Sequence, residues 1–162
     1  MRNIKALALD VDGVLTDGGF WWGPNGEEWK RFCFADVMGI SLAKKSGLIV
    51  ALITGEDSPL VARFASKMGI TAVEKNCKDK ARALRSFAER RGLALREVCF
   101  MGDDVNDLEA MRIAGLAAAP ASAVPEVLKA AAFIAKKPGG NGAVRELVDS
   151  LLLAKAAELV HA

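Results

Sequence analysis

The stretch Ile4–Gly13, with the sequence IKALALDVDG, decides the fold of this 162-residue chain. Its first six residues are apolar except for Lys5, which is typical of a short strand buried on both faces of a parallel sheet. The run stops at Asp10, and Asp12 follows two residues later. A buried strand that ends in carboxylates predicts an open α/β sheet with its ligand site beyond the carboxyl ends of the strands.

Strand-like and helix-like segments alternate along the rest of the chain. Further strands are predicted at residues 48–53, 71–73, 98–101, 116–118 and 132–134. Helices are predicted at residues 36–46, 59–68, 78–91, 107–114, 123–130 and 144–160. This alternation favours right-handed crossovers and one doubly wound, mostly parallel sheet covered by helices on both faces. We therefore expect a single Rossmann-like α/β domain over residues 1–162.

One segment, at about residues 18–34, interrupts this alternation. It is rich in aromatic residues and contains Gly-Pro-Asn-Gly at positions 23–26, a turn signal between two strand-like arms. We expect a β-hairpin inserted into the domain. Such a small insertion has little core in which to bury Trp21, Trp22 and Trp29, so these side chains are predicted to form an interface with another subunit.

Composition and charge exclude several classes of protein. The net charge is +2 and the basic residues are spread along the chain, which argues against a nucleic-acid partner. No apolar stretch approaches the roughly 18 residues needed to cross a bilayer, and the N-terminal apolar run is too short for a signal peptide. Three widely spaced cysteines favour neither disulfides nor a zinc site. A soluble, cytoplasmic protein is expected, with Cys33, Cys77 and Cys99 as small buried apolar residues and His161, next to the C-terminus, as a disordered residue.

Acidic residues gather where the predicted strands end. Asp10 and Asp12 follow the first strand, and Asp103 and Asp104 follow the strand at residues 98–101. Carboxylates that meet at one edge of a sheet repel one another unless a hard cation such as Mg2+ lies between them. Asp10 could then attack phosphorus as a nucleophile, while Asp12 acts as general acid and base and Asp103 completes the metal site.

Other residues near these positions have more than one reading. Thr54 ends the second strand and could hold phosphoryl oxygens together with Lys80, but Lys80 also fits a solvated helix face beside Lys78 and Arg82. Asp104 and Asp107 could only cap the helix that follows them. Residues 139–142, Gly-Gly-Asn-Gly, could be a flexible loop or a cradle for an anion.

Four segments in this order resemble the motifs of the haloacid dehalogenase superfamily of phosphatases. They are DVDGVLTDG at residues 10–18, ITG at 53–55, Lys80, and GDDVND at 102–107. The resemblance covers essentially the whole chain and implies phosphomonoester hydrolysis through an aspartyl phosphate. The roles that it implies are a nucleophile at Asp10, an acid and base at Asp12, phosphate ligands at Thr54 and Lys80, magnesium ligands at Asp10, the Asp12 carbonyl and Asp103, and loop support from Asp104 and Asp107.

Additional segments resemble the capless branch of this superfamily that acts on 3-deoxy-ulosonic acids. They are NGEEWKRF at residues 25–32, Met38-Gly39-Ile40, and GGNGAVRE at 139–146. The resemblance implies substrate contacts from Gly39, Ile40, Gly55, Glu56, Arg63 and Lys67. Members of the branch often carry Arg where this chain has Phe64. Arg63 next to it either substitutes for that Arg or leaves the substrate carboxylate without this contact.

Two substrates compete within that branch. Glu56 and Lys67 resemble the type that hydrolyses 2-keto-3-deoxynononate 9-phosphate, so the nine-carbon substrate is favoured, with 3-deoxy-D-manno-octulosonate 8-phosphate as the alternative. The resemblance also implies a homotetramer in which a neighbouring subunit closes the site, since the chain has no room for a cap domain. A non-catalytic oligomerisation module and a phosphomutase are the rival readings. The first conflicts with the complete catalytic set, and the second with the missing cap.

Overall fold

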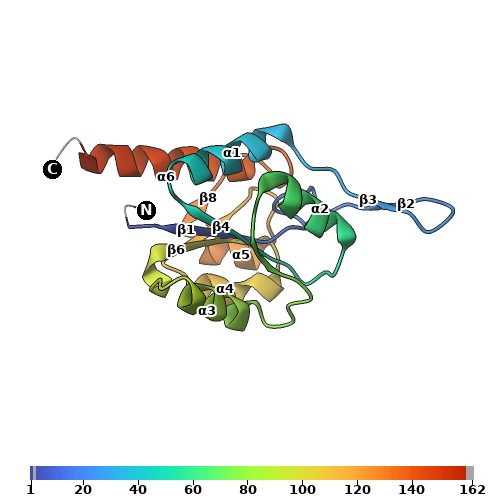
Figure 1. The fold of residues 1–162 in the computed structure, drawn as a ribbon, viewed down its shortest axis with the longest axis horizontal. Helices are drawn as coiled ribbons and strands as arrows, with labels where there is room; N and C mark the ends of the chain where they lie inside the picture. The colour runs from blue at the N-terminus through green and yellow to red at the C-terminus, as the bar shows by residue number, and fades with distance from the viewer. Residues whose placement is uncertain (2, 160–162) are drawn as a thin grey trace.

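A six-stranded parallel sheet forms the centre of the molecule in the computed structural model, which describes residue 1 and residues 3–159 (Figure 1). The strand order is β5-β4-β1-β6-β7-β8. The strands are β1 (Ala6–Leu9), β4 (Ile49–Ile53), β5 (Ala72–Glu74), β6 (Val98–Met101), β7 (Leu116–Ala119) and β8 (Phe133–Ile134). All neighbouring pairs in this sheet are parallel, so the predicted doubly wound α/β domain is confirmed.

The strand order reverses direction around β1. From β1 the chain proceeds outward to β4 and β5, then crosses back to β6 on the other side of β1 and continues to β7 and β8. The register places Leu9 opposite both Leu52 and Met101, so three neighbouring strands end at nearly the same level. Residues that follow these strands therefore lie side by side at the switch point, where ligands bind in open α/β sheets.

Helices cover both faces of the sheet (Figure 1). On one face lie α1 (Phe34–Lys45), α2 (Pro59–Met68) and α6 (Ala143–Leu159), packed on the side chains of Leu7 and Leu9. On the other lie α3 (Lys80–Arg90), α4 (Leu108–Ile113) and α5 (Pro125–Ala130), packed on Ala6 and Ala8. None of the helices described is both long and apolar enough to cross a bilayer.

Local capping explains where several helices begin. Helix α2 begins at Pro59, as predicted, because Ser58 Oγ accepts a hydrogen bond from the Leu60 N–H at 3.2 Å. Helix α3 begins at Lys80 and not at residue 78, since Asp79 caps it by accepting from the Arg82 N–H at 2.8 Å. This later start places Lys80 in the first turn of α3, at the edge of the sheet where the strands end.

The predicted hairpin projects from the carboxyl end of the sheet (Figure 1). Its strands β2 (Trp21–Trp22) and β3 (Glu28–Trp29) are short and antiparallel. Trp21, Trp22 and Trp29 are each more than half exposed within the single chain. The structure thus confirms an insertion with little core of its own and leaves its aromatic side chains uncovered.

Candidate active site

Asp10 follows the central strand β1, and the surrounding strands bury its side chain. Its Oδ1 lies 2.9 Å from Lys80 Nζ, and the same nitrogen lies 2.7 Å from Asp107 Oδ1. Lys80 itself is only 3% exposed, so its charge depends on these two carboxylates for compensation. The reading of Lys80 as part of a solvated helix face is therefore wrong.

Asp107 organises the loop between β6 and α4. Its Oδ2 accepts the backbone N–H groups of Asp103 and Asp104 at 3.0 and 3.3 Å, while its Oδ1 faces Lys80. Gly102 makes this closure possible, because a Cβ atom there would lie 2.4 Å from the Cβ of Asp107. With both oxygens already partnered, Asp107 fits the predicted supporting role. Asp104 caps the short turn after it, since its Oδ1 accepts the Val105 N–H at 2.6 Å.

The carboxylates of this site form a crowded cluster. One oxygen from each of Asp10, Asp103 and Asp107 lies within 4.8 Å of the others. Burial, followed by repulsion from Asp107, raises the pKa of Asp10 to about 8 despite the opposing effect of Lys80. The same two causes raise the pKa of Asp103 to about 6. One lysine does not neutralise the cluster, and its oxygen ligands fit a hard divalent cation such as Mg2+.

Asp12 lies in the loop after β1 and is held from the hairpin side. Its Oδ1 lies 2.8 Å from Nζ of Lys30, a residue just after β3. Its Oδ2 is buried and has no hydrogen-bond partner among the described residues. Buried polar atoms nearly always have partners, so an exception of this kind points to a bound group that the protein alone does not supply.

A pocket of about 340 Å³ brings the predicted catalytic residues together. It is lined by Asp10, Asp12, Gly18, Thr54, Gly55, Glu56, Lys80, Asp103, Asp104, Val105 and Asn106. Thr54 is anchored on both sides, because its N–H donates to the Glu74 carbonyl at 2.9 Å and its carbonyl accepts from the Cys77 N–H at 3.0 Å. Its hydroxyl oxygen accepts the Glu56 N–H at 3.1 Å and so occupies a defined place in the pocket wall.

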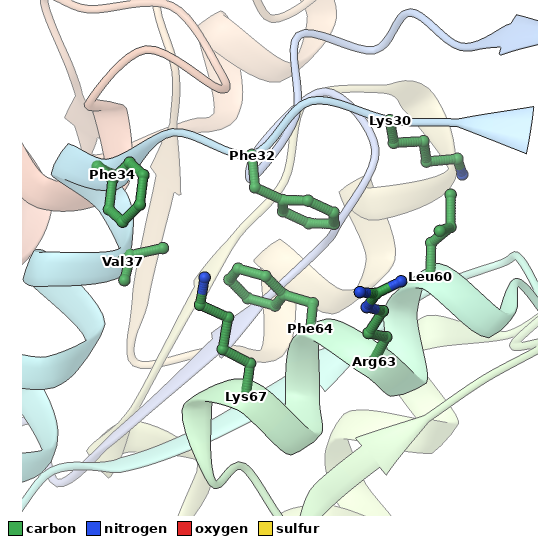
Figure 2. Close-up of a pocket in the computed structure, with 8 residues that line it drawn as sticks. All are labelled: Lys30, Phe32, Phe34, Val37, Leu60, Arg63, Phe64 and Lys67. Carbon is green, nitrogen blue, oxygen red and sulfur yellow. The ribbon is translucent and has the colours of Figure 1, made fainter.

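A second pocket, of about 260 Å³, contains the other predicted substrate contacts (Figure 2). Arg63 and Lys67 extend from α2 toward the segment that joins the hairpin to α1 (Figure 2). Phe64 does not leave a gap in this wall, since its ring stacks on Phe32 with centroids 4.3 Å apart. The complete lining is Lys30, Phe32, Phe34, Val37, Leu60, Arg63, Phe64 and Lys67, which includes three cations and no acidic residue.

Gly39 and Ile40 lie in neither of these two pockets. Both are in the middle of α1, where Ile40 is completely buried in the core. Gly39 instead allows α1 to approach α6, because a Cβ atom there would lie 2.8 Å from the Arg145 Cα. Within one chain, Gly39 and Ile40 therefore contribute to helix and core packing and do not make the substrate contacts that were predicted for them.

The Gly139–Gly142 loop does not form an anion cradle in this chain. Its four N–H groups donate to the Ser122 hydroxyl, the carbonyls of Val14 and Pro138, and the Asp36 carboxylate. The loop packs closely on the loop after β1, since a Cβ atom at Gly139 would lie 1.8 Å from the Gly13 carbonyl oxygen. It supports the catalytic loop and offers no free amides to a ligand.

Lys30, Arg31 and Asp36 contribute to the site but carried no role in the sequence prediction. Arg31 donates to the Gly140 carbonyl and to Asn141 Oδ1, both at 3.1 Å, and Asp36 accepts from the Gly142 and Arg145 N–H groups. The segment NGEEWKRF contained two of the three, but charged residues on a hairpin arm are ordinarily solvated. Of the cysteines, Cys99 is buried as predicted, Cys33 and Cys77 are half-buried, and His161 lies outside the described residues.

The sheet topology and this acidic pocket define a class of hydrolase. Residues 34–147 match the family of haloacid dehalogenase-like hydrolases, and the chain belongs to that family. Within this family, the chain is similar to phosphatases of one kind. The chain is 41% identical over 154 residues to the 3-deoxy-D-manno-octulosonate 8-phosphate phosphatase KdsC of Escherichia coli K12, covering 95% of this chain and 82% of the relative. It is 38% identical to the enzyme of the same name from Yersinia pestis over 153 residues, covering 94% and 82%.

Solved structures agree with this relationship. The 3-deoxy-D-manno-octulosonate 8-phosphate phosphatase of Yersinia pestis superimposes with a TM-score of 0.94 at 37% identity, covering 96% of this chain and 84% of that one. The enzyme of that name from Moraxella catarrhalis, in complex with a magnesium ion, a phosphate ion and a KDO molecule, gives 0.93 at 36% identity, covering 99% and 94%. The predicted resemblance to this superfamily and to its capless branch is confirmed.

Proposed function

We propose that this chain is a magnesium-dependent phosphatase that releases the terminal phosphate of 3-deoxy-D-manno-octulosonate 8-phosphate. The main support for this reaction is that the predicted catalytic residues line one pocket at the switch point of the sheet. They are Asp10, Asp12, Thr54, Lys80 and Asp103. The similarity to phosphatases with this substrate in their names supports the eight-carbon acid. It favours the substrate that the sequence analysis held as the alternative to the nine-carbon acid.

The proposed reaction has two covalent steps. Asp10 attacks phosphorus while Asp12 gives a proton to the departing alcohol oxygen, which leaves an aspartyl phosphate on Asp10. Asp12 then takes a proton from water as the water attacks the same phosphorus and releases phosphate. Lys80 and Thr54 bind the phosphoryl oxygens throughout. Mg2+, held by Asp10, Asp103 and the Asp12 carbonyl, would neutralise charge that develops on the phosphoryl group.

The body of the substrate has a place in the second pocket. Lys30 connects the two pockets, because it lines the second one and forms an ion pair with Asp12 in the first. Arg63 and Lys67 provide cations there for the carboxylate of a sugar acid, while Glu56 and Gly55 lie beside the catalytic groups. A phosphate at Asp10 and a carboxylate near Arg63 would be the two ends of one ligand.

Parallel kinetics on the two candidate substrates test the assignment. We expect kcat/KM to be at least about tenfold higher for the eight-carbon phosphate, equivalent to about 1.4 kcal/mol of transition-state discrimination. Arg63→Met and Lys67→Met should raise KM for the sugar acid and leave hydrolysis of p-nitrophenyl phosphate unchanged. A kcat/KM that is higher by the same factor for 2-keto-3-deoxynononate 9-phosphate would instead identify the nine-carbon acid as the substrate.

The proposed assembly is a homotetramer in which hairpins of neighbouring chains help to close the site. The exposed aromatic arm and the missing cap support it, since a site without a cap must be shielded from bulk solvent and must bind the body of the substrate by some other means. The rival reading, an oligomerisation module without activity, predicts no phosphate release from any sugar phosphate in the presence of Mg2+. It also predicts that Asp10→Asn changes nothing, and both results together would replace the phosphatase assignment.

A further inference from the structure

Lys30 joins the base of the hairpin to the predicted general acid. We propose that Lys30 is a positioning residue for Asp12: by holding Oδ1, it fixes the orientation of the carboxyl group that protonates the leaving oxygen of the substrate. The inference deepens the proposed function and rests on it. Neither the motifs around Asp10 nor those around Asp103 contain this contact, which joins residues 18 positions apart through the fold.

The burial of the Lys30 side chain supports a specific role for this contact over a chance surface pair. The Lys30 side chain is only 4% exposed and lies 2.8 Å from Asp12 Oδ1, and its next acidic neighbour, Glu28 Oε1, is 3.8 Å away. Surface lysines gain little from such pairs, but a desolvated lysine that loses its carboxylate is strongly destabilised. Because Lys30 occupies Oδ1, the two oxygens of Asp12 are not equivalent, and only Oδ2 is left without a partner among the described residues.

The segment around Lys30 is fixed at its neighbouring positions. Arg31 holds the Gly139–Gly142 loop through Gly140 and Asn141, and Phe32 stacks on Phe64. Three consecutive side chains thus connect the hairpin base to the catalytic loop, to its supporting loop and to α2. Lys30 therefore approaches Asp12 from a rigid position, which is what an orienting contact requires.

The chemistry predicts where this orientation matters. In the first step the bond between phosphorus and the alcohol oxygen breaks, and that oxygen needs the Asp12 proton if it would otherwise leave as a strongly basic alkoxide. A p-nitrophenolate leaving group is a weak base and departs without a proton. Loss of correct orientation should therefore lower kcat/KM for aliphatic substrates and spare kcat/KM for the aryl substrate. This ratio covers the steps up to release of the alcohol and excludes the later hydrolysis of the aspartyl phosphate, in which Asp12 acts for both substrates. Loss of phosphate binding would instead lower kcat/KM for both equally.

The test compares two substrates in Lys30→Met. With the aliphatic phosphate, we expect kcat/KM to fall roughly 10- to 100-fold and kcat to fall with it, a part of the 10²–10⁴ that general acids supply. With p-nitrophenyl phosphate, kcat/KM should fall less than about threefold. Lys30→Arg should restore most of the loss, since it keeps a charged donor. In an Asp12→Asn background, Lys30→Met should have no further effect on kcat for the aliphatic phosphate.

The matched control is Lys5→Met, which removes an exposed lysine paired with Glu97 at the opposite end of the sheet. It should leave both substrates unaffected. Should Lys30→Met unfold, Lys30→Gln fills the buried space with a neutral polar side chain that is one bond shorter, and it should show the same difference between substrates. Equal losses of kcat/KM on both substrates, or an effect on the aliphatic phosphate confined to KM, would overturn the inference. The aliphatic phosphate is any that the unaltered protein hydrolyses, so a wrong sugar acid would reject the proposed substrate alone.

Discussion

Asp10 combines two properties that conflict in a protein without a bound cation. Its side chain is buried, and it shares that burial with Asp107 and Asp103 while Lys80 supplies the nearby positive charge. Burial favours the protonated acid, whereas nucleophilic attack needs the carboxylate. A divalent cation removes the conflict, so a role in catalysis and a dependence on metal have the same physical origin.

Replacing this side chain tests the covalent step. Asp10→Asn keeps the shape of the residue and removes the nucleophile, so we expect kcat to fall by about 10³-fold or more with the fold retained. Phosphate release and circular dichroism would measure the two effects. The matched control is Asp149→Asn on α6, where a half-exposed carboxylate pairs with Arg145, and it should keep full activity. Substantial turnover by Asp10→Asn would contradict the assigned nucleophile.

The raised pKa values predict how pH affects the metal-free protein. The pKa of Asp10 rises from 3.8 to about 8, so between these values the folded state holds a proton that the unfolded chain has released. The stabilisation is complete below the unfolded pKa and is lost as pH rises through about 8. Asp103, with a pKa of about 6, acts in the same direction over a lower range.

Thermal unfolding in EDTA across this range would measure the effect. We expect the midpoint to fall as pH rises from about 5 to about 8, and to recover at the upper end when Mg2+ is added. A midpoint that rises over the same interval without metal would show that the cluster is ionised and compensated by protein groups alone.

The loop between β1 and the hairpin depends on one glycine. Gly13 has φ of +88°, and a Cβ atom there would lie 1.9 Å from Asp103 Oδ2. Position 13 therefore needs glycine for two separate reasons, the left-handed backbone and the close approach of the loop after β6. The second reason couples the catalytic loop to the metal site.

A pair of substitutions separates these reasons. Gly47, after α1, has φ of +87°, and a Cβ atom there would meet nothing within 4 Å, so Gly47→Ala should cost about 1–2 kcal/mol of stability and leave kcat unchanged. Gly13→Ala should cost at least as much and also displace Asp103, lowering both Mg2+ affinity and kcat. Calorimetric titration with Mg2+ and steady-state kinetics would measure these changes. Equal behaviour of the two variants would show that only backbone strain matters at Gly13.

At the scale of the whole molecule, the hairpin is the part that leaves a group of aromatic side chains exposed in the single chain. Phe20, Trp21, Trp22 and Trp29 are each at least half exposed on an arm that extends beyond the sheet (Figure 1). Exposed apolar groups gathered in this way mark interaction sites more often than free surface. A second copy of the chain is the expected partner, and the site beneath the arm would be enclosed by it.

Removing the aromatic surface tests this assembly. Trp21→Ser combined with Trp22→Ser should lower the mass of the particle in light scattering, because the proposed tetramer would lose apolar contact area. Leu153→Ser is the matched control, since Leu153 is 72% exposed on α6. Figure 1 shows α6 on the other side of the molecule from the hairpin. The control should leave the mass unchanged. An unaltered mass in the double variant would place the subunit interface elsewhere.

The sheet and much of the acidic pocket could be predicted from local patterns. Short apolar runs ending at Asp10, Thr54 and Gly102 identified three strands. They also identified the edge of the sheet where ligands bind, because the carboxyl ends of parallel strands all lie at the same edge. The first turn of α2 was equally readable, since Pro59 and its cap act within a few residues. Positions of this kind depend on near neighbours and on the alternation of apolar segments, which are visible in the sequence itself.

The remaining features depend on contacts between distant segments. Lys80 is buried only because α3 brings it between Asp10 and Asp107, and Lys30 meets Asp12 only because the hairpin base folds back over the first loop. The amides at residues 139–142 are occupied by partners far away in the chain, and Gly39 serves helix packing. Charge and burial at such positions follow from three-dimensional proximity, which periodicity and local propensity do not encode.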